Sequence, residues 1–408
     1  MVRIKKELKI EEEFGEVGLR RWGNIVSDEF LKELQGKKAL RIYREMAEND
    51  PTIGAIIYAL KQFMGQASLI IEPADDSQEA KWIADEVVKD FRNLDPPLTP
   101  EFLFLAANFV VYGFAVFEEV FRARDGRVAI VKLSYRMPET IERWEFSEKG
   151  EVLGCYQRLL SGQEVFLPRW KILHIVTPGY SYNPMGRSLL RNAYVPYTFK
   201  KHLQILEGIG VERDLVGLPV LYVPQTVFKD ESKVAELKEL LRQLRRDEQE
   251  GLILPRAIAG SEQLWELKLL SLSGSRQFST SDIIARYNQE IAHTLLADLI
   301  LVGLEARGSY ALAREKRSLF EVGVQTCLDA IASSIRRDVL KTLMKLNGWE
   351  EEKAPILRLV LPRKPTIDEL VDLISAVSKL QMPSEELGQV VSELSTLARE
   401  IVGLGGRA

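Results

Sequence analysis

The stretch NPMGRSLLRNAYVPYTFKKHLQILEGIGVERDLVGLPVLYVP, residues 183–224, decides how the rest of this sequence is interpreted. It opens with glycine- and proline-rich punctuation and continues into a long helical segment that ends before Gly217. The apolar run LPVLYVP then predicts a strand. We therefore expect a long helix over about 187–213, followed by a strand that begins a separate small unit.

A small α/β unit is predicted after that helix, over 214–272. The segment DESKVAELKELLRQLRRDEQEG, residues 230–251, has apolar residues along one side of a helix, and the run GLILP indicates another strand. A second long helix is expected over 279–297, because that segment opens with a Ser/Thr/Asp cap. The small unit is therefore interpreted as an insertion between two long helices.

Short β-rich segments fill the sequence from about residue 103 to residue 176. Turn signals at 125–126, 149–150 and 161–162 separate them, each with a glycine in second place. Helical periodicity precedes this region, including TIGAIIYALKQFMGQA with Thr52 as its expected N-cap. Antiparallel strands embedded between helical regions indicate the α+β class rather than alternating βαβ units.

The C-terminal part is predicted to be mostly helical. Apolar residues recur at helical spacing over 310–346, which at 1.5 Å per residue would span roughly 50 Å. A strand is expected near 355–362, and prolines then mark a boundary before a helical pair over 366–404. At the other end of the chain, residues 1–25 are polar and are expected to form a partly mobile arm.

The composition is that of a folded protein without a basic excess. The 408 residues have a formal net charge of −4. This balance argues against a protein that grips DNA over a large basic surface, but it is compatible with a channel through which DNA slides. Only 8 Asn occur beside many Glu, Lys and Arg, which is typical of proteins from thermophilic hosts.

Nothing in the sequence predicts export or membrane insertion. The N-terminal segment is charged throughout, unlike a signal peptide, and no apolar run approaches the ~18 residues that span a bilayer. Cys155 and Cys327 lie far apart in apolar patterns and are expected to be reduced, buried thiols. We therefore expect synthesis in the cytoplasm and no membrane partner.

Motifs for catalysis or metal binding are not found. The sequence contains no G-x-x-x-x-G-K-[ST] phosphate loop, no G-x-S-x-G nucleophile elbow and no H-E-x-x-H zinc motif. His174 and His293 are expected to lie in the core, and Glu118-Glu119 is interpreted as a pair of solvated charges. We predict no enzyme activity, no metal and no cofactor.

Basic residues on the polar side of the 230–251 helix form the one charged group of interest: Lys238, Arg242, Arg245 and Arg246. Over residues 229–250 there are six Lys/Arg against seven Asp/Glu. This balance indicates a salt-bridged face rather than a nucleic-acid patch, with ion pairs formed within one chain or between subunits.

The segment 183–224 resembles the corresponding segment of Mu-type phage portal proteins. In that family an N-P-x-G-R-S-L-L-R motif opens the long helix, which leads to a small-residue turn and a G-x-P-V-L strand. The order of the flanking segments is also similar, with TIGAIIYALKQ upstream and KILHIV just before the motif. The resemblance covers roughly residues 40–345, and nothing familiar is found in the last 45 residues.

The resemblance implies the portal fold, with a β-rich wing, long stem helices, a small α/β clip, a tunnel loop with a long backing helix, and a helical crown. The implied divisions are an N-terminal arm (1–25), wing (26–186), stem helix (187–213), clip (214–272), second stem helix (279–297), tunnel loop (298–310), tunnel helix and wing strand (311–365) and crown (366–408).

The implied function is that of a ring, expected to be a dodecamer, at one capsid vertex of the virion. Double-stranded DNA would pass through its channel during packaging and ejection, without sequence-specific contacts. The implied partners are the terminase large subunit, the major capsid and scaffolding proteins, and the head–tail adaptor proteins. The four basic residues of the clip helix would contact the terminase or an adaptor.

The tunnel loop is the segment that this resemblance places nearest the DNA. Its residues are too apolar for open solvent, so they should line a constriction or an interface; the alternative is that they belong to the core. The expected channel-lining residues are Leu299, Ile300, Leu301, Val302, Leu304, Glu305 and Arg307.

Two other interpretations remain open. One is a cytosolic scaffold that oligomerises through 310–346 and 366–404 without passing DNA. The other is a nucleic-acid-processing enzyme whose site has no familiar motif. Ring formation, nuclease or ATPase activity, and a gene position beside a large terminase would separate the three.

Overall fold

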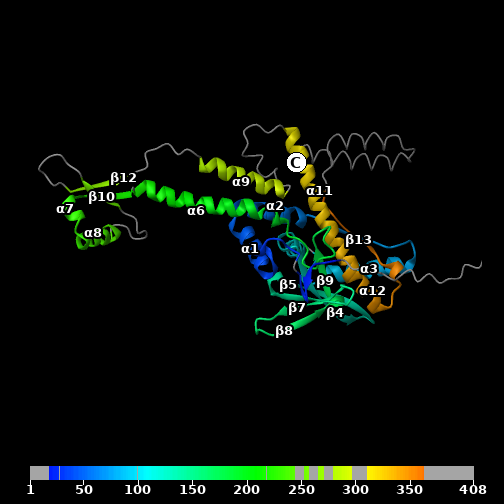
Figure 1. The fold of residues 1–408 in the computed structure, drawn as a ribbon. Coiled ribbons are helices and arrows are strands. Elements are labelled where there is room, and N and C mark those ends of the chain that lie inside the picture. The colour runs from blue at the N-terminus through cyan, green and yellow to red at the C-terminus, as the bar shows by residue number, and fades with distance from the viewer. Residues whose placement is uncertain are drawn as a thin grey trace, which may run out of the picture.

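The computed structural model describes residues 18–362, apart from 27, 99, 217, 244–251, 257–264, 271–278 and 296–309. Figure 1 shows a body of sheets and helices, from which a rod of two helices leads to a small module at its far end. A further long helix, α11, leaves the body in another direction. Helices and antiparallel sheets are both extensive, so the α+β class is confirmed.

Two three-stranded antiparallel sheets form the β-rich part of the body. Their orders are β5-β4-β9 and β6-β7-β8. The strand bounds are β4 (Phe114–Arg124), β5 (Arg127–Arg136), β6 (Ile141–Phe146), β7 (Val152–Arg158), β8 (Glu164–Pro168) and β9 (Ile172–Val176). Apolar residues of both sheets, including Phe114, Trp144 and Cys155, are buried together. The predicted meander of antiparallel strands is confirmed.

Helices cover the other face of the β5-β4-β9 sheet and form the larger core with it. Those that precede the sheet are α1 (Gly36–Asn49), α2 (Pro51–Gly65), α3 (Gln78–Arg92), α4 (Pro100–Ala106) and α5 (Asn108–Tyr112). The predicted N-cap of α2, Thr52, is wrong. Asp50 caps the helix by accepting the backbone N–H groups of Thr52 and Ile53, because Pro51 has no N–H to cap and fits the first helical position.

Distant parts of the chain close the body. Strand β3 (Ser68–Glu72) pairs antiparallel with β13 (Ile356–Val360), which confirms the strand predicted near 355–362. At the start of the described chain, β1 (Arg21–Trp22) and β2 (Ile25–Val26) form a hairpin. The Asn24 backbone carbonyl in its turn accepts the Trp144 N–H at 3.3 Å, and the Asn24 amide donates to Glu145 at 2.7 Å.

This docked hairpin corrects the boundary predicted between an arm over 1–25 and the domain that follows. Residues 21–26 are paired with one another and bonded to β6, so a division after residue 25 would cut a single structural unit. The first 17 residues of the predicted arm lie outside the described part of the chain.

The rod consists of α6 (Tyr194–Val216) and α9 (Thr280–Thr294), which pack along each other (Figure 1). The prediction that the first long helix begins at residue 187 is wrong, because residues 187–193 are irregular apart from a 3₁₀ turn, η4 (Leu189–Arg191). Pro196 lies in the first turn of α6, where a missing N–H costs nothing. Helix α9 begins as predicted, capped by the Ser279 side chain.

The module at the end of the rod, here the tip module, is a small α/β unit. It contains β10 (Leu218–Pro224), α7 (Gln225–Phe228), α8 (Glu231–Gln243), β11 (Leu252–Arg256) and β12 (Glu266–Leu270). Strand β10 is central; it pairs in parallel with β11 and antiparallel with β12. The α/β character predicted for 214–272 is confirmed.

The last long helix runs over its whole predicted length, 310–346, but a π-helical turn interrupts its α-helical geometry. Helix α11 (Tyr310–Ile335) passes into a π-helical turn, η6 (Arg336–Leu340), and continues as α12 (Lys341–Asn347). Gly348, with a φ of 67°, ends α12 in the left-handed conformation. Among the helices that the structure describes, none is both long and apolar enough to cross a membrane.

Candidate functional site

The Asn-Pro-Met-Gly-Arg-Ser segment forms a joint between the body and the rod. The Asn183 side chain accepts the Met185 N–H at 2.9 Å, which sets the turn. Ser188 accepts the Leu190 N–H and donates its hydroxyl to the backbone carbonyl of Val111 at 2.5 Å. The motif is therefore a fastened loop that brings α6 to the surface of the body, rather than the first turn of a helix.

Two glycines allow this loop to lie directly on the chain that enters β4. A Cβ atom on Gly186 would lie 2.1 Å from the Gly113 carbonyl oxygen, and one on Gly113 would lie 2.4 Å from the Met185 carbonyl oxygen. Both have positive φ, +56° and +93°. The Thr177 hydroxyl lies 2.8 Å from the backbone oxygens of Gly113 and Arg187, so it joins the two segments.

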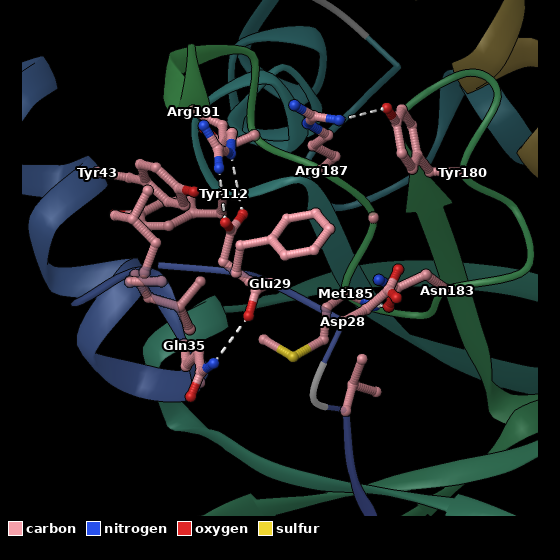
Figure 2. Close-up of a pocket in the computed structure, with 18 of the residues that line it drawn as sticks. Asp28, Glu29, Gln35, Tyr43, Tyr112, Tyr180, Asn183, Met185, Arg187 and Arg191 are labelled. Atoms are coloured by element: carbon pink, nitrogen blue, oxygen red, sulfur yellow. Dashed lines mark hydrogen bonds and ion pairs between the residues drawn. The ribbon is translucent and has the colours of Figure 1, made fainter. Parts of the chain in front are cut away.

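A hollow of about 540 Å³ opens beside this joint (Figure 2). The joint loop, helix α1 and the segment 28–35 line it, and four of its lining residues are tyrosines: Tyr43, Tyr112, Tyr180 and Tyr182. In Figure 2 the Arg191 side chain points at Glu29, and the Arg187 side chain points at the hydroxyl of Tyr180. The hollow thus combines aromatic surfaces with the guanidinium groups of Arg187 and Arg191, which already bond to Tyr180 and Glu29.

A bidentate ion pair joins Arg191 and Glu29 in the hollow. The two N–O distances are 3.0 and 2.7 Å. Burial raises the pKa of Glu29, but hydrogen bonds from Arg191 and from the Leu31 N–H outweigh it, so the net effect is to lower that pKa. Burial also raises the pKa of Tyr112 to about 12, so its phenol stays protonated near neutrality.

The joint is linked to the π-turn through His174. Its ring Nε2 lies 2.8 Å from the Pro184 carbonyl oxygen; a carbonyl only accepts, so Nε2 carries the proton. Burial, with Arg169 nearby, lowers the pKa of His174 to about 3, so the ring is neutral. The backbone N–H of His174 donates to Asp338 of the π-turn at 3.0 Å. The predicted core position of His174 is confirmed, whereas His293 is exposed and its core prediction is wrong.

A buried polar network holds the base of the rod. Lys200 of α6 donates to Asp50 at 2.7 Å, and these side chains are only 3% and 4% exposed. Thr52 lies 3.4 Å from the Lys200 ammonium and donates to Asn288 of α9 at 2.9 Å. One network therefore fixes α2, α6 and α9 relative to one another.

On the side of α6 that faces away from Lys200, an apolar stripe is exposed to solvent. Val195, Phe199 and Leu206 are 46%, 58% and 49% exposed, and with His202 they recur at intervals of four, three and four residues. Such spacing places side chains on one face of a helix. The Phe199 ring stacks on Tyr287 of α9 at 6.3 Å, so the stripe continues onto the second helix.

The sequence-predicted site residues are only partly within the described chain. The expected tunnel-loop residues, from Leu299 to Arg307, lie outside it, as do Arg245, Arg246 and the segment 366–408. Lys238 and Arg242 lie on α8, where Lys238 is exposed. The joint, the Lys200 network and the π-turn were not predicted, because their contacts join segments far apart in the sequence.

The interpretation of Glu118-Glu119 as two solvated charges is half wrong. Glu118 is partly exposed and pairs with Arg136, but Glu119 is fully buried at 0% exposure. The apolar run FAVFEEVF is the pattern of a strand covered on both faces, which signals that a glutamate within it can be buried but does not say which of the two. Cys155 and Cys327 are free and buried, as predicted. Within the described residues, no three His, Cys, Asp or Glu side chains are grouped as metal ligands.

Comparison with known proteins gives a consistent result. A family model described as the portal protein of Mu bacteriophage matches residues 40–390. Among solved structures, one chain from the virion of a native gene transfer agent (GTA) particle covers 86% of this chain and 92% of its own, with 14% identity and a TM-score of 0.55.

Two further matches come from the necks of such particles. A chain in the neck of an empty GTA particle, computed with C6 symmetry, has a TM-score of 0.55; one in the neck of a native particle, computed with C12 symmetry, has 0.53. Both are 14% identical, with the same coverage. At this identity, the structural likeness establishes the fold.

Proposed function

Because this chain belongs to the Mu-type phage portal proteins, we propose that it assembles into a ring at one vertex of a capsid and that double-stranded DNA passes through it. The observation that carries the proposal is the family match over residues 40–390. The exposed apolar stripe on the rod supports it, because it offers a surface for contact between copies. A heterologous contact joins two different faces of neighbouring copies, and it closes into a ring when the rotation between copies divides a full turn evenly. The C12 symmetry of one similar neck supports twelve copies.

In this proposal the parts of the fold take the family's names. The sheets and helices of the body are the wing, α6 and α9 are the stem, and the tip module is the clip that docks the terminase and later the adaptors. Residues 298–310 are the tunnel loop, backed by α11, and 366–408 are the crown. The chain supplies a passage and docking surfaces; the terminase supplies the energy that moves DNA.

The ring is tested by placing charges on the apolar stripe. The double substitution F199D/L206D should abolish ring formation, because a carboxylate cannot be buried without a partner in a contact between copies. Native mass spectrometry and negative-stain electron microscopy measure the result. Wild-type protein should form closed rings with a central hole of roughly 20 Å or more, the width of duplex DNA.

A matched control is available on the same helix. Gln204 is exposed but lies on the opposite side of α6 from the stripe, so Q204D should leave the rings intact. Circular dichroism should show that all variants fold. Rings of unchanged mass from F199D/L206D would refute the role of the stripe, and a closed wild-type particle without a hole would refute the portal function.

The tunnel loop is tested by one substitution that changes polarity at nearly constant size. V302N should reduce the number of DNA-filled particles several-fold, because an amide at the constriction would bind phosphates where an aliphatic group gives only steric contact. V302I, which stays aliphatic, should behave as wild type. Unchanged packaging and unchanged retention of DNA in V302N would show that Val302 does not face the DNA.

A further inference from the structure

Glu119 is a buried carboxyl group without a hydrogen-bond partner. It is fully buried, and neither of its side-chain oxygens has a partner among the described residues. The other buried carboxylates differ: Asp50 accepts three hydrogen bonds, Asp90 holds Arg127 in a fork, and Asp338 is surrounded by donors. An ionised carboxylate in such a place would be costly, so an unpartnered one is expected to carry a proton.

Glu119 lies beneath the place where the long helix is fastened to the sheet. Strand β4 presents it on the same face as Phe117, which packs in the core with Val339 and Leu340 of the π-turn. The fastening itself is Asp338, which accepts Arg169 at 2.5 Å, the His174 N–H at 3.0 Å and Arg337 at 2.9 Å. π-Turns inside α-helices are rare and are frequently found at functional sites.

The charged groups around Glu119 come from each element packed on it. Asp338 acts on it from the π-turn, and Arg169 and Lys171 act on it from the 3₁₀ turn η3 (Arg169–Lys171). His174 of β9 points to the other face of the sheet, where its ring packs on Phe114 and Trp144. Burial and then the charge of Asp338 raise the pKa of Glu119 to about 8, against smaller opposite effects of Arg169 and Lys171. Asp338 keeps a lowered pKa despite its burial, because Arg337 and Arg169 bind it.

We propose that Glu119 and Asp338 form a proton-operated latch: a protonated Glu119 lets Asp338 hold the π-turn on the sheet, and loss of that proton releases Arg336–Asn347. The physical cause is competition. Once Glu119 is ionised, two carboxylates share the Arg169 guanidinium and repel each other, and opening the π-turn lets water reach the buried one. The latch would let the protonation state of one side chain set how firmly the π-turn and α12 are held to the body.

The sign of the pH dependence follows from the raised pKa. The pKa of Glu119 is about 8 in the closed state, against 4.5 for a carboxyl group in water. Its contribution to the stability of the closed state is therefore fully present below pH 4.5. This contribution is lost as pH rises and is gone above about pH 8. His174 has a lowered pKa, so its contribution to stability changes with pH only below its ordinary pKa of 6.5. Between pH 6.5 and pH 8, a change in stability therefore reports on Glu119 and not on His174.

Hydrogen exchange of the full chain tests the latch. After correction for the intrinsic exchange rate, the opening constant of amides in 336–347 should rise on the order of tenfold from pH 6.5 to pH 8 in the wild type. In E119Q, which is similar in size and does not titrate, it should change less than about twofold. E118Q is the matched control: Glu118 lies on the opposite face of the strand, so this variant should show the wild-type rise.

Three outcomes would overturn the latch. These are an unchanged wild-type opening constant over this window, a rise that persists in E119Q, and a rise spread over the whole body rather than confined to the π-turn and α12. The first needs no substitution at all, so the proposal stays testable even if E119Q folds poorly.

Discussion

Replacing Lys200 by methionine is expected to destabilise the base of the rod by about 3–5 kcal/mol, because it leaves the Asp50 carboxylate buried without its cation. The packing of the side chain is largely kept, so the lost charge accounts for most of the effect. Lys200 also contacts the network that reaches α9 through Thr52 and Asn288, so the two rod helices should loosen together. Urea unfolding, followed by hydrogen exchange in α6 and α9, measures both effects.

Two companion variants isolate the buried charge. K201M removes the neighbouring ion pair with Glu45, whose side chains are about half exposed, and should cost less than about 1 kcal/mol. In K200M/D50N the asparagine can still cap α2, but no charge is left unpaired, so at least half of the stability should return. A K200M variant as stable as K201M would show that the buried pair does not fix the rod.

Replacing Gly186 by alanine is expected to disrupt the joint between body and rod. The added Cβ would lie 2.1 Å from the Gly113 carbonyl oxygen, and the residue has a φ of +56°, which alanine adopts at a cost. Strain and overlap together should cost about 4 kcal/mol or more, because the two nearest atoms belong to the Gly113 backbone, which cannot move aside as the end of a flexible side chain could. For a body of this size, the thermal midpoint should fall by at least about 8 °C.

Gly179 provides the matched control for this substitution. It also has a positive φ, +81°, but a Cβ atom there would meet nothing within 4 Å. G179A should therefore cost only the backbone strain, about 1 kcal/mol after the gain from a stiffer unfolded chain. Equal melting of the two variants would show that the close approach of the two glycines does not hold the joint.

The stability of the body should therefore depend on a few long-range contacts. The Lys200 network fixes the direction of the rod, the Gly113–Gly186 approach fixes its point of attachment, and Asp338 fixes the long helix. In the proposed ring, every copy would have to hold these directions alike, since a rod that swings could not meet its neighbour's stripe at the same height.

Features of the fold that depend on neighbouring residues could be predicted from the sequence. Apolar spacing identified the long helices and glycine turns identified the antiparallel strands, because periodicity and turn chemistry act over a few residues. The N-P-M-G-R-S-L-L-R segment identified the family. Features that depend on how distant elements pack against one another required the tertiary structure. It placed the start of α6 at Tyr194, paired β3 with β13, and buried Glu119 while Glu118 stayed at the surface. Burial of a charged side chain follows from the elements that pack over it, and these come from segments more than a hundred residues apart.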